Sequence, residues 1–384
     1  MLKVERLKAN DYNELLDFYN LVFTKQNARL MDFTKELPAM WIRDDEYMRR
    51  HFVIRENGKI VSSVGVYPMK TYIAGEEFIF STLGNVATHP DCEGRGYMKT
   101  LMSSAIGELA EIKADAARLG GLRQRYNRYG FESCGSEIHF SFTERNKKIL
   151  CAEVNDRLKF REVFQADEKA LKFISSLGKE GIWVDYGSDF GYRATFLALT
   201  AWNNRIFVAE DAFGNPVSYL CAFPDAGNLS RIFAKDEETL MQTVCSWQRF
   251  TGKTVEFTLA PWQVKEINTF YPVCEGCYVN SPSMFKIINW QKIVLALMKL
   301  KSSYAELPDG EFILGIECYG NLRLKMHGGA AFCEKTEKEA EFKADALTAS
   351  RLLFGPLSAD CFAFSNTAKS WFPLPLSWNT QDRM

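Results

Sequence analysis

The sequence predicts a mixed α/β protein, with α+β and α/β features, in which several small sheets are covered by helices. Two turn signals predict β-hairpins: Asn57-Gly58 separates one pair of strand-like runs, and Gly75 separates a second pair. Apolar residues recur at three- and four-residue steps between Met98 and Ile112, which predicts a helix with one buried face. The same succession of hairpin, strand, helix and strand returns between residues 204 and 259, which indicates an internal duplication.

Composition excludes several classes of protein. The 384 residues suffice for two or three domains, and 47% hydrophobic residues allow large cores. A net charge of −1 offers no field for nucleic acid or an anionic membrane, so neither is expected as a partner. With no run of 18 apolar residues, no visible signal peptide and ten cysteines outside any disulfide framework, we expect a cytoplasmic protein. The one Cys-x-x-Cys, Cys274 to Cys277, lacks the further ligands of a zinc site, so no metal is expected.

Residues 1–148 are predicted to form the first domain. The elements expected in it are, in order, a helix over 11–24, strands over 51–55, 59–68 and 78–88, the helix that starts near Met98, and a buried strand over 116–122. The domain is expected to close with Tyr126-x-x-x-Gly130-Phe131.

Residues 149–284 are predicted to form a second domain that repeats this order without its active parts. The elements expected in it are strands over 204–211, 215–223 and 229–233, a helix over 237–251 and a strand over 254–259. Where a phosphate-binding loop would sit, residues 234–238 contain no glycine and three acids, which is poor chemistry for an anion.

Residues 285–384 are predicted to form a third, α+β domain. The elements expected in it are a helix over 291–301, strands over 311–319 and 321–327, and a helix over 345–354. Asp345 is placed to cap the last helix, and Gly355-Pro356 to stop it. The final ten residues carry aromatic and apolar anchors, which favours a docked chain end.

The most informative stretch is the turn between the strand over 78–88 and the helix that follows it. It reads Glu93-Gly94-Arg95-Gly96-Tyr97-Met98. Glycines allow backbone N–H groups to converge on a phosphate, and the dipole of the following helix favours the same anion. The Glu93 carboxylate would repel a phosphate unless Arg95 or Lys99 offsets it.

This loop resembles the acetyl-CoA pyrophosphate loop of the GNAT acetyltransferase superfamily, R/Q-x-x-G-x-G/A, from which Glu93 and Met98 depart. The Gly-Tyr-Met continuation and the Tyr126–Phe131 motif are similar to the Eis-type (enhanced intracellular survival) branch. The resemblance covers nearly the whole chain. It implies tandem GNAT domains, the second degenerate, followed by a sterol-carrier-like domain, in a homo-oligomer that is a hexamer in that branch.

The resemblance also implies an acetyl-CoA-dependent N-acetyltransferase, with acetyl-CoA as co-substrate. By its register, the cofactor-binding groups are the strand residues Val86, Ala87 and Thr88 and the loop residues Glu93, Gly94, Arg95, Gly96 and Tyr97.

The catalytic roles follow from the same resemblance. Tyr126 is the acid that protonates the departing CoA thiolate, a role suited to a phenol with a pKa of about 10, and Tyr129 is the adjacent alternative. The C-terminal carboxylate, here that of Met384, orients the amine and balances its charge. Transfer is direct, in a ternary complex, to a primary amine of a polyamine-like or aminoglycoside-like cation.

Acceptor recognition is expected from residues 23–47, where Phe33 and Trp41 either line a pocket or belong to the core. Acidic residues there and at the chain end could attract a cation: Asp32, Glu36, Asp44, Asp45, Glu46 and Asp382. Two alternatives stay open. One is a protein or peptide amine as acceptor, and the other is a non-catalytic CoA- or ligand-binding protein with a decayed GNAT site.

Overall fold

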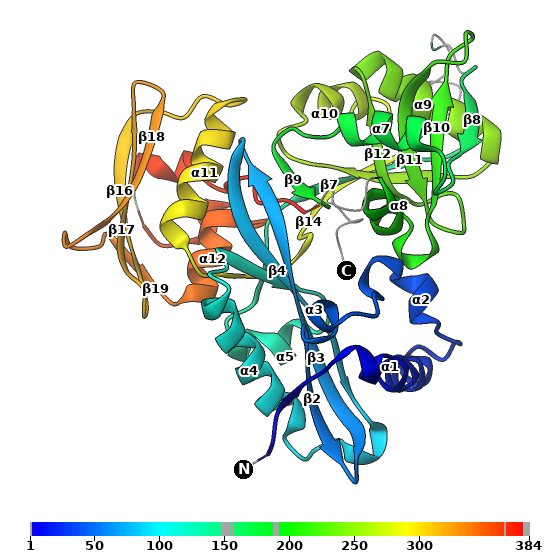
Figure 1. Ribbon diagram of the computed structural model, residues 1–384. Coiled ribbons are helices and arrows are strands. Elements are labelled where there is room, and N and C mark those ends of the chain that lie inside the picture. The colour runs from blue at the N-terminus through cyan, green and yellow to red at the C-terminus, as the bar shows by residue number, and fades with distance from the viewer. Residues whose placement is uncertain (1, 147–153, 155–156, 187–191, 365, 379–384) are drawn as a thin grey trace.

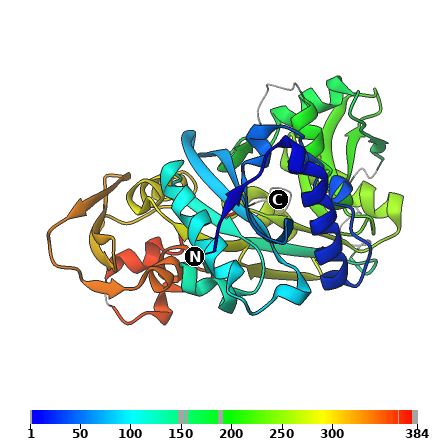
Figure 2. The ribbon, with the colours of Figure 1, turned by 60° about the horizontal axis from the view of Figure 1, so that its bottom comes forward.

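The computed structural model describes residues 2–146, 154, 157–186, 192–364 and 366–378. It has the predicted mixed α/β character, with four sheets in three units (Figure 1). In Figure 2 the C-terminal unit and the second unit, drawn orange and green, lie on opposite sides of the first. No helix in the described part of the chain is both long and apolar enough to cross a membrane.

The largest sheet has eight strands and organises the first unit. Its strands are β1 (Glu5–Arg6), β2 (His51–Glu56), β3 (Lys59–Ile73), β4 (Glu76–Thr88), β5 (Ala116–Leu119), β15 (Ser283–Ile287) and β6 (Glu132–Cys134), in that order. An eighth strand, β9 (Ile182–Asp185), pairs with the C-terminal end of β3, on the same edge as β2. The predicted turns are present. Asn57 and Gly58 have positive φ values of 50° and 79°, and Gly75 has a positive φ of 82°.

Helices cover both faces of this sheet because its strands alternate between two apolar clusters. Val53 of β2 packs with helix α1 (Tyr12–Asn27), whereas its neighbours Phe52 and Ile54 pack with helix α4 (Tyr97–Glu111). The short helices α2 (Phe33–Glu36) and α3 (Asp45–Met48) follow α1, and α5 (Arg123–Tyr126) follows β5.

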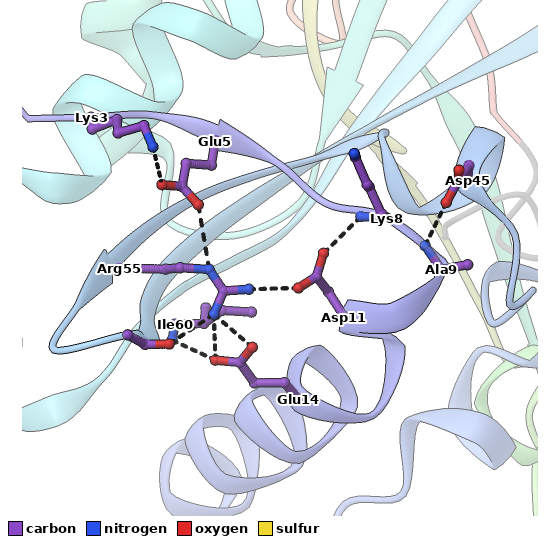
Figure 3. Close-up of polar contacts among 10 residues, drawn as sticks. Lys3, Glu5, Lys8, Ala9, Asp11, Glu14, Asp45, Arg55 and Ile60 are labelled. Carbon is purple, nitrogen blue, oxygen red and sulfur yellow. Dashed lines mark hydrogen bonds and ion pairs between the residues drawn. The ribbon is translucent and has the colours of Figure 1, made fainter.

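An arginine cluster fastens the start of α1 to β2 (Figure 3). The Arg55 guanidinium lies 2.6 Å from Glu14, 2.8 Å from Asp11 and 3.5 Å from Glu5. Its side chain is only 18% exposed, so these ion pairs are shielded from solvent more than ordinary surface pairs. The cluster therefore holds the start of α1 against the sheet.

The second unit repeats the order of the first. Its strands are β8 (Lys159–Glu162), β10 (Arg205–Glu210), β11 (Pro216–Ala222), β12 (Leu229–Ala234), β13 (Val255–Leu259) and β14 (Gly276–Asn280), and its helices are α7 (Glu168–Ser176), α8 (Arg193–Leu199), α9 (Glu237–Thr251) and α10 (Val264–Phe270). Helix α9 has the predicted bounds, and β10 to β13 lie within a residue or two of prediction.

The two units exchange strands. β15 lies between β5 and β6 of the first sheet, and β7 (Glu137–Phe142) lies between β13 and β14 of the second. Each donated strand occupies the same position relative to its neighbours. Strand β7 precedes the predicted boundary between residues 148 and 149 but pairs with strands of the second unit, and β15 follows it but pairs in the first sheet. The boundary itself stays a prediction about the order of the chain.

The C-terminal unit shares its core with the first. It contains α11 (Trp290–Ser302), β16 (Gly310–Ile316), β17 (Gly320–His327), β18 (Ala330–Thr336), β19 (Phe342–Ala344) and α12 (Ala346–Phe354). Asp345 caps α12 as predicted, its carboxylate accepting from the Thr348 N–H at 2.6 Å. The far half of the β3–β4 hairpin inserts Ile73 and Phe78 into this core, and Figure 1 shows that hairpin rising between the other two units.

The described chain end returns to the first sheet. The Ser136 N–H donates to the Leu376 carbonyl at 2.8 Å, and Trp378 stacks on Phe80 of β4 with ring centroids 5.3 Å apart. Trp378 is 2% exposed, so the predicted docking is observed as far as this residue.

Candidate active site

The loop before α4 has the backbone that an anion site requires. Gly94 and Gly96 take φ values of +75° and +80°, and Gly96 caps α4 without any side-chain cap. No atom lies within 4 Å of a Cβ built on either glycine. The N–H groups of Gly94, Arg95 and Gly96 bond to no other described residue. This open loop at a helix N-terminus fits a pyrophosphate.

The side chains of this loop turn away from it, toward Glu56 on β2. The Arg95 guanidinium lies 2.9 Å from the Glu56 carboxylate, and the Tyr97 hydroxyl donates to the same group. The Tyr97 hydrogen bond and the Arg95 charge hold the pKa of Glu56 below its usual value. Arg95 is therefore committed to Glu56, and Lys99 remains the exposed cation available to offset Glu93.

The strand before the loop opens away from its parallel neighbour. β4 pairs with β5 only from Phe80 to Thr82, the last pair being Thr82 with Arg118, while β4 runs on to Thr88. A register shift opposite β3 at residues 63–65 and a positive φ of 52° at Asn85 mark a bulge at this point. The edge of residues 83–88 that would face β5 is therefore free of strand pairing, as an extended ligand arm would require.

The three strand residues expected to contact the cofactor lie on this opened segment. Val86 packs toward the α4 cluster, and Ala87 toward the α1 cluster. The Thr88 hydroxyl bonds to Ser62 on β3 at 2.8 Å. Their side chains thus hold the strand in place, leaving the backbone as the part available to a ligand.

Tyr126 ends helix α5 and is 5% exposed. It belongs to the same apolar cluster as Val86, Tyr97 and Met98, which brings the predicted acid and the loop to one face of the sheet. Burial raises the pKa of its phenol, and the Arg125 charge opposes that effect. A raised pKa keeps the phenol protonated, which suits an acid. Its ring covers the Gly121 backbone, where an added Cβ would lie 3.1 Å away.

Tyr129, the adjacent alternative, sits in the same cluster. Its hydroxyl is buried and has no hydrogen-bond partner among the residues that the structure describes. Such a group costs free energy unless something bonds to it, so Tyr129 remains a rival for the same role.

Met384 lies outside the described residues. Trp378, six residues earlier, lies beside Phe80 and under the Arg118 guanidinium, 5.1 Å from its ring centroid. Arg118 is the last β5 residue paired with β4. Trp378 therefore lies beside the strands where β4 and β5 part.

A cavity of about 640 Å³ lies on the other side of β3 from this opening. β3 pairs with β2 up to Gly65 and with β9 from Lys70, so the edge between them is open. The segment from Pro38 to Arg50 and helix α8 complete the walls. The volume is that of a small-molecule site.

A buried polar network joins this cavity to the bulge of β4. The Asn85 amide donates to the Tyr67 hydroxyl at 2.9 Å, and Tyr67 lines the cavity. His51 lies 3.4 Å from the same hydroxyl and 3.1 Å from that of Tyr19. Burial lowers the pKa of His51 to about 3, so its imidazole is neutral. The Tyr67 ring needs Gly65 beneath it, because a Cβ there would lie 2.1 Å from the hydroxyl.

One of the two aromatic residues considered in the sequence analysis lies in the wall of this cavity. Trp41 lines the cavity, as one expectation had it, whereas Phe33 is 1% exposed and belongs to the core. Tyr67, Arg50 and the residues of β9 and α8 were missed, because only the fold brings them together. In the described chain no cluster of histidine, cysteine and acidic side chains could hold a metal.

Residues 3–134 match the family model described as acetyltransferase (GNAT) domain. This segment is a GNAT acetyltransferase domain. It makes the chain an N-acetyltransferase whose acyl donor is acetyl-CoA, the co-substrate of that family. The open glycine loop and the unpaired edge of β4 fit this co-substrate, with the loop N–H groups available to its pyrophosphate and the strand backbone to its arm.

Three solved structures resemble the chain over nearly its full length. A GCN5-related N-acetyltransferase from Anabaena variabilis has a TM-score of 0.67 at 13% identity, covering 99% of this chain and 98% of that one. A probable N-acyltransferase from Enterococcus faecalis gives 0.66 at 15% identity, with 98% and 96% covered. Eis1 from Mycobacterium abscessus gives 0.65 at 10% identity, with 97% and 96% covered. At such identities the likeness shows a shared fold alone. No curated protein sequence matches the chain.

Proposed function

We propose that this protein transfers an acetyl group directly from acetyl-CoA to a primary amine of a small molecule, in a ternary complex. One observation carries the proposal: the glycine loop and the opened strands lie on one side of β3–β4, the cavity on the other, and Asn85 with Tyr67 connects them. Such an arrangement holds donor and acceptor together, so that proximity supplies much of the rate.

The side chains take distinct roles in this proposal. The loop N–H groups at Gly94–Tyr97 bind the pyrophosphate, and the backbone of Val86–Thr88 binds the arm of the co-substrate. The neutral amine nitrogen forms a bond to the thioester carbonyl carbon, the carbon–sulfur bond breaks, and Tyr126 gives its proton to the leaving thiolate. The acetylated nitrogen loses its extra proton, which restores the Tyr126 phenol. No covalent enzyme intermediate is required, and Cys92, which is buried, has no part in the reaction.

The carboxylate of Met384 is proposed to orient the amine and balance its charge. The docked position of Trp378 supports this role. A tag appended after Met384 removes the free carboxylate from its place. We expect such a tag to lower turnover while leaving acetyl-CoA affinity unchanged; equal turnover with and without the tag would exclude the role.

The proposal treats residues 149–284 as a degenerate second GNAT domain and residues 285–384 as a sterol-carrier-like domain. The repeated strand order and the reciprocal exchange of β7 and β15 support duplication. The turn before α9 is capped by Asp236, whose carboxylate accepts from the Thr239 N–H at 2.7 Å and so occupies the place an anion would take. A hexameric assembly remains a prediction from the resemblance.

Calorimetric titration of acetyl-CoA into the untagged protein tests the proposal. We expect one site per chain with micromolar affinity, followed by acetylation in an amine screen. Two sites per chain would contradict a degenerate second domain. The absence of binding would mean that Glu93 and Met98 disable the loop, and would favour a non-catalytic binding protein.

Small molecules are favoured over protein amines because the cavity is walled by segments of both the first and second units. Turnover of peptides but of no small amine would reverse that preference. A polyamine-like or aminoglycoside-like cation is the acceptor class that the resemblance implies, and the charges around the cavity bear on it directly.

A further inference from the structure

The described residues that line the cavity carry more positive than negative charge. Four of these side chains are basic, Arg43, Arg50, Lys70 and Arg193, and one is acidic, Asp185. The charge of Lys70 has acidic neighbours, because Lys70 pairs with Glu77 at 3.2 Å and has Asp185 as its cross-strand partner. The three arginines therefore determine the sign of the charge that the cavity presents.

Arg50 is the best placed of these arginines. Its side chain is 24% exposed, and its guanidinium lies over the Tyr47 ring, 4.1 Å from the centroid. Among the described residues it forms an ion pair with Glu46, which is 79% exposed and 3.8 Å away, too loose and solvated to neutralise it. The Arg50 charge also acts on the pKa values of Tyr67 and His51 in the cavity wall. Arg50 thus presents a fixed positive charge to the cavity.

Arg43 and Arg193 reinforce that charge. The Arg43 guanidinium lies 5.6 Å from the centroid of the Tyr12 ring, and neither arginine forms an ion pair with any residue that the structure describes. Guanidinium groups of this kind bind carboxylate and phosphate oxygens through paired hydrogen bonds.

Of the acidic residues expected to attract a cation, Asp382 lies outside the described residues, and the others do not line the cavity. Asp32 and Asp44 cap helices α2 and α3, and Glu36 pairs with Arg29 at 2.6 Å. Asp45 accepts from the Ala9 N–H at 2.7 Å (Figure 3). Their charges are used in the fold, so a polycation entering the cavity would meet arginines instead.

We propose that the acceptor is a small primary amine that also carries an anionic oxygen group, a carboxylate or a phosphate, bound by Arg50 with Arg43 and Arg193. The inference rests on the proposed acetyl transfer. Apolar residues also line the cavity, among them Trp41, Met69 and Leu197, and they suit a carbon chain that joins the amine to the anion.

Three amines of one chain length test the charge preference. In 6-aminohexanoate, hexylamine and 1,6-diaminohexane the reacting amine is the same, and the far end is anionic, neutral or cationic. We expect kcat/KM for 6-aminohexanoate to exceed that for the diamine by about tenfold or more, the effect of one well-placed ion pair. A higher kcat/KM for the diamine would overturn the inference. A fourth amine, 3-aminopropyl phosphate, distinguishes phosphate from carboxylate.

Arginine variants assign the effect to the cavity. Arg50→Gln should lower kcat/KM for 6-aminohexanoate about tenfold and change that for hexylamine less than about twofold, whereas Arg50→Lys should keep the order of the three amines. Arg49→Gln is the matched control, because Arg49 is exposed and does not line the cavity. An equal loss for all three amines in Arg50→Gln would show a structural role for Arg50 and contradict the inference. Arg43→Gln, at an exposed side chain, repeats the test should Arg50→Gln fold poorly.

Binding separates this inference from the proposed function. Calorimetry with 6-aminohexanoate and with 1,6-diaminohexane, each in the presence of CoA, measures the preference without turnover. If no amine is acetylated the proposed function fails, and tighter binding of the amino acid than of the diamine would still uphold the anion site. Tighter binding of the diamine would overturn it even in an active acetyltransferase.

Discussion

Replacing Gly96 by alanine tests whether the loop backbone binds the co-substrate. Gly96 has φ 80° and ψ 6° at the N-cap of α4, a left-handed conformation that costs a residue with a Cβ roughly 1–2 kcal/mol. No atom lies within 4 Å of the added Cβ, so no clash contributes. If the free loop relaxes to avoid this strain, acetyl-CoA must restore it on binding. The dissociation constant should then rise roughly 5- to 30-fold.

Gly75→Ala is the matched control. Gly75 has φ 82° with no atom within 4 Å of its Cβ, and so carries the same strain. It lies at the far end of the 13-residue strand β4, about 40 Å from the loop. Calorimetric titration of acetyl-CoA should show that Gly96→Ala loses affinity and that Gly75→Ala does not. Thermal unfolding shows whether each free variant keeps the strain, because a retained strain lowers stability and a relaxed one does not. Wild-type affinity in a Gly96→Ala variant of wild-type stability, whose free loop has therefore relaxed, would refute the assignment of this loop to the pyrophosphate.

Three further predictions concern buried groups. Tyr126→Phe should lower turnover about tenfold or more with acetyl-CoA affinity unchanged, whereas Tyr129→Phe should not; the reverse result would exchange their roles. Glu132 is fully buried between two arginines at 2.5 Å, and although burial alone would raise its pKa, these partners hold that pKa below its usual value. Glu132→Gln should lower the free energy of unfolding by an amount at the lower end of roughly 3–5 kcal/mol, and this loss should fade as pH falls below about 4.3. Glu108→Gln, in a partly exposed ion pair, should lower it by under about 1 kcal/mol. Equal losses in denaturant unfolding would contradict this. His51, with a pKa of about 3 in the fold and 6.5 when unfolded, should make stability fall by about 1.4 kcal/mol per pH unit as pH drops below 6.5, and His51→Gln should flatten that slope.

Local elements were predictable because their signals lie within a few residues of one another. Helix α9 has the predicted bounds, and Asp345 and Asn57-Gly58 form the predicted cap and turn. The glycine loop is likewise local, since positive φ at Gly94 and Gly96 is a property that their own chemistry permits.

Arrangements that depend on distant segments were not predictable in this way. The pairing of β15 with β5 joins residues more than 160 positions apart, and nothing in either strand specifies that partner. The same holds for Arg95, which with Lys99 was one of two residues that could offset Glu93. It pairs with Glu56 instead, because side-chain partners follow from which strand lies opposite.

By itself the sequence determined the helices, the hairpins and the loop that identify an acetyltransferase, since periodicity and turn chemistry act over short stretches of chain. Only the tertiary structure decided where β4 leaves β5 and which edge of β3 stays open. It also decided that basic residues outnumber acidic ones among the described residues that line the cavity. The physical reason is that a site's charge and shape belong to side chains gathered from several elements, and their gathering is settled by long-range packing.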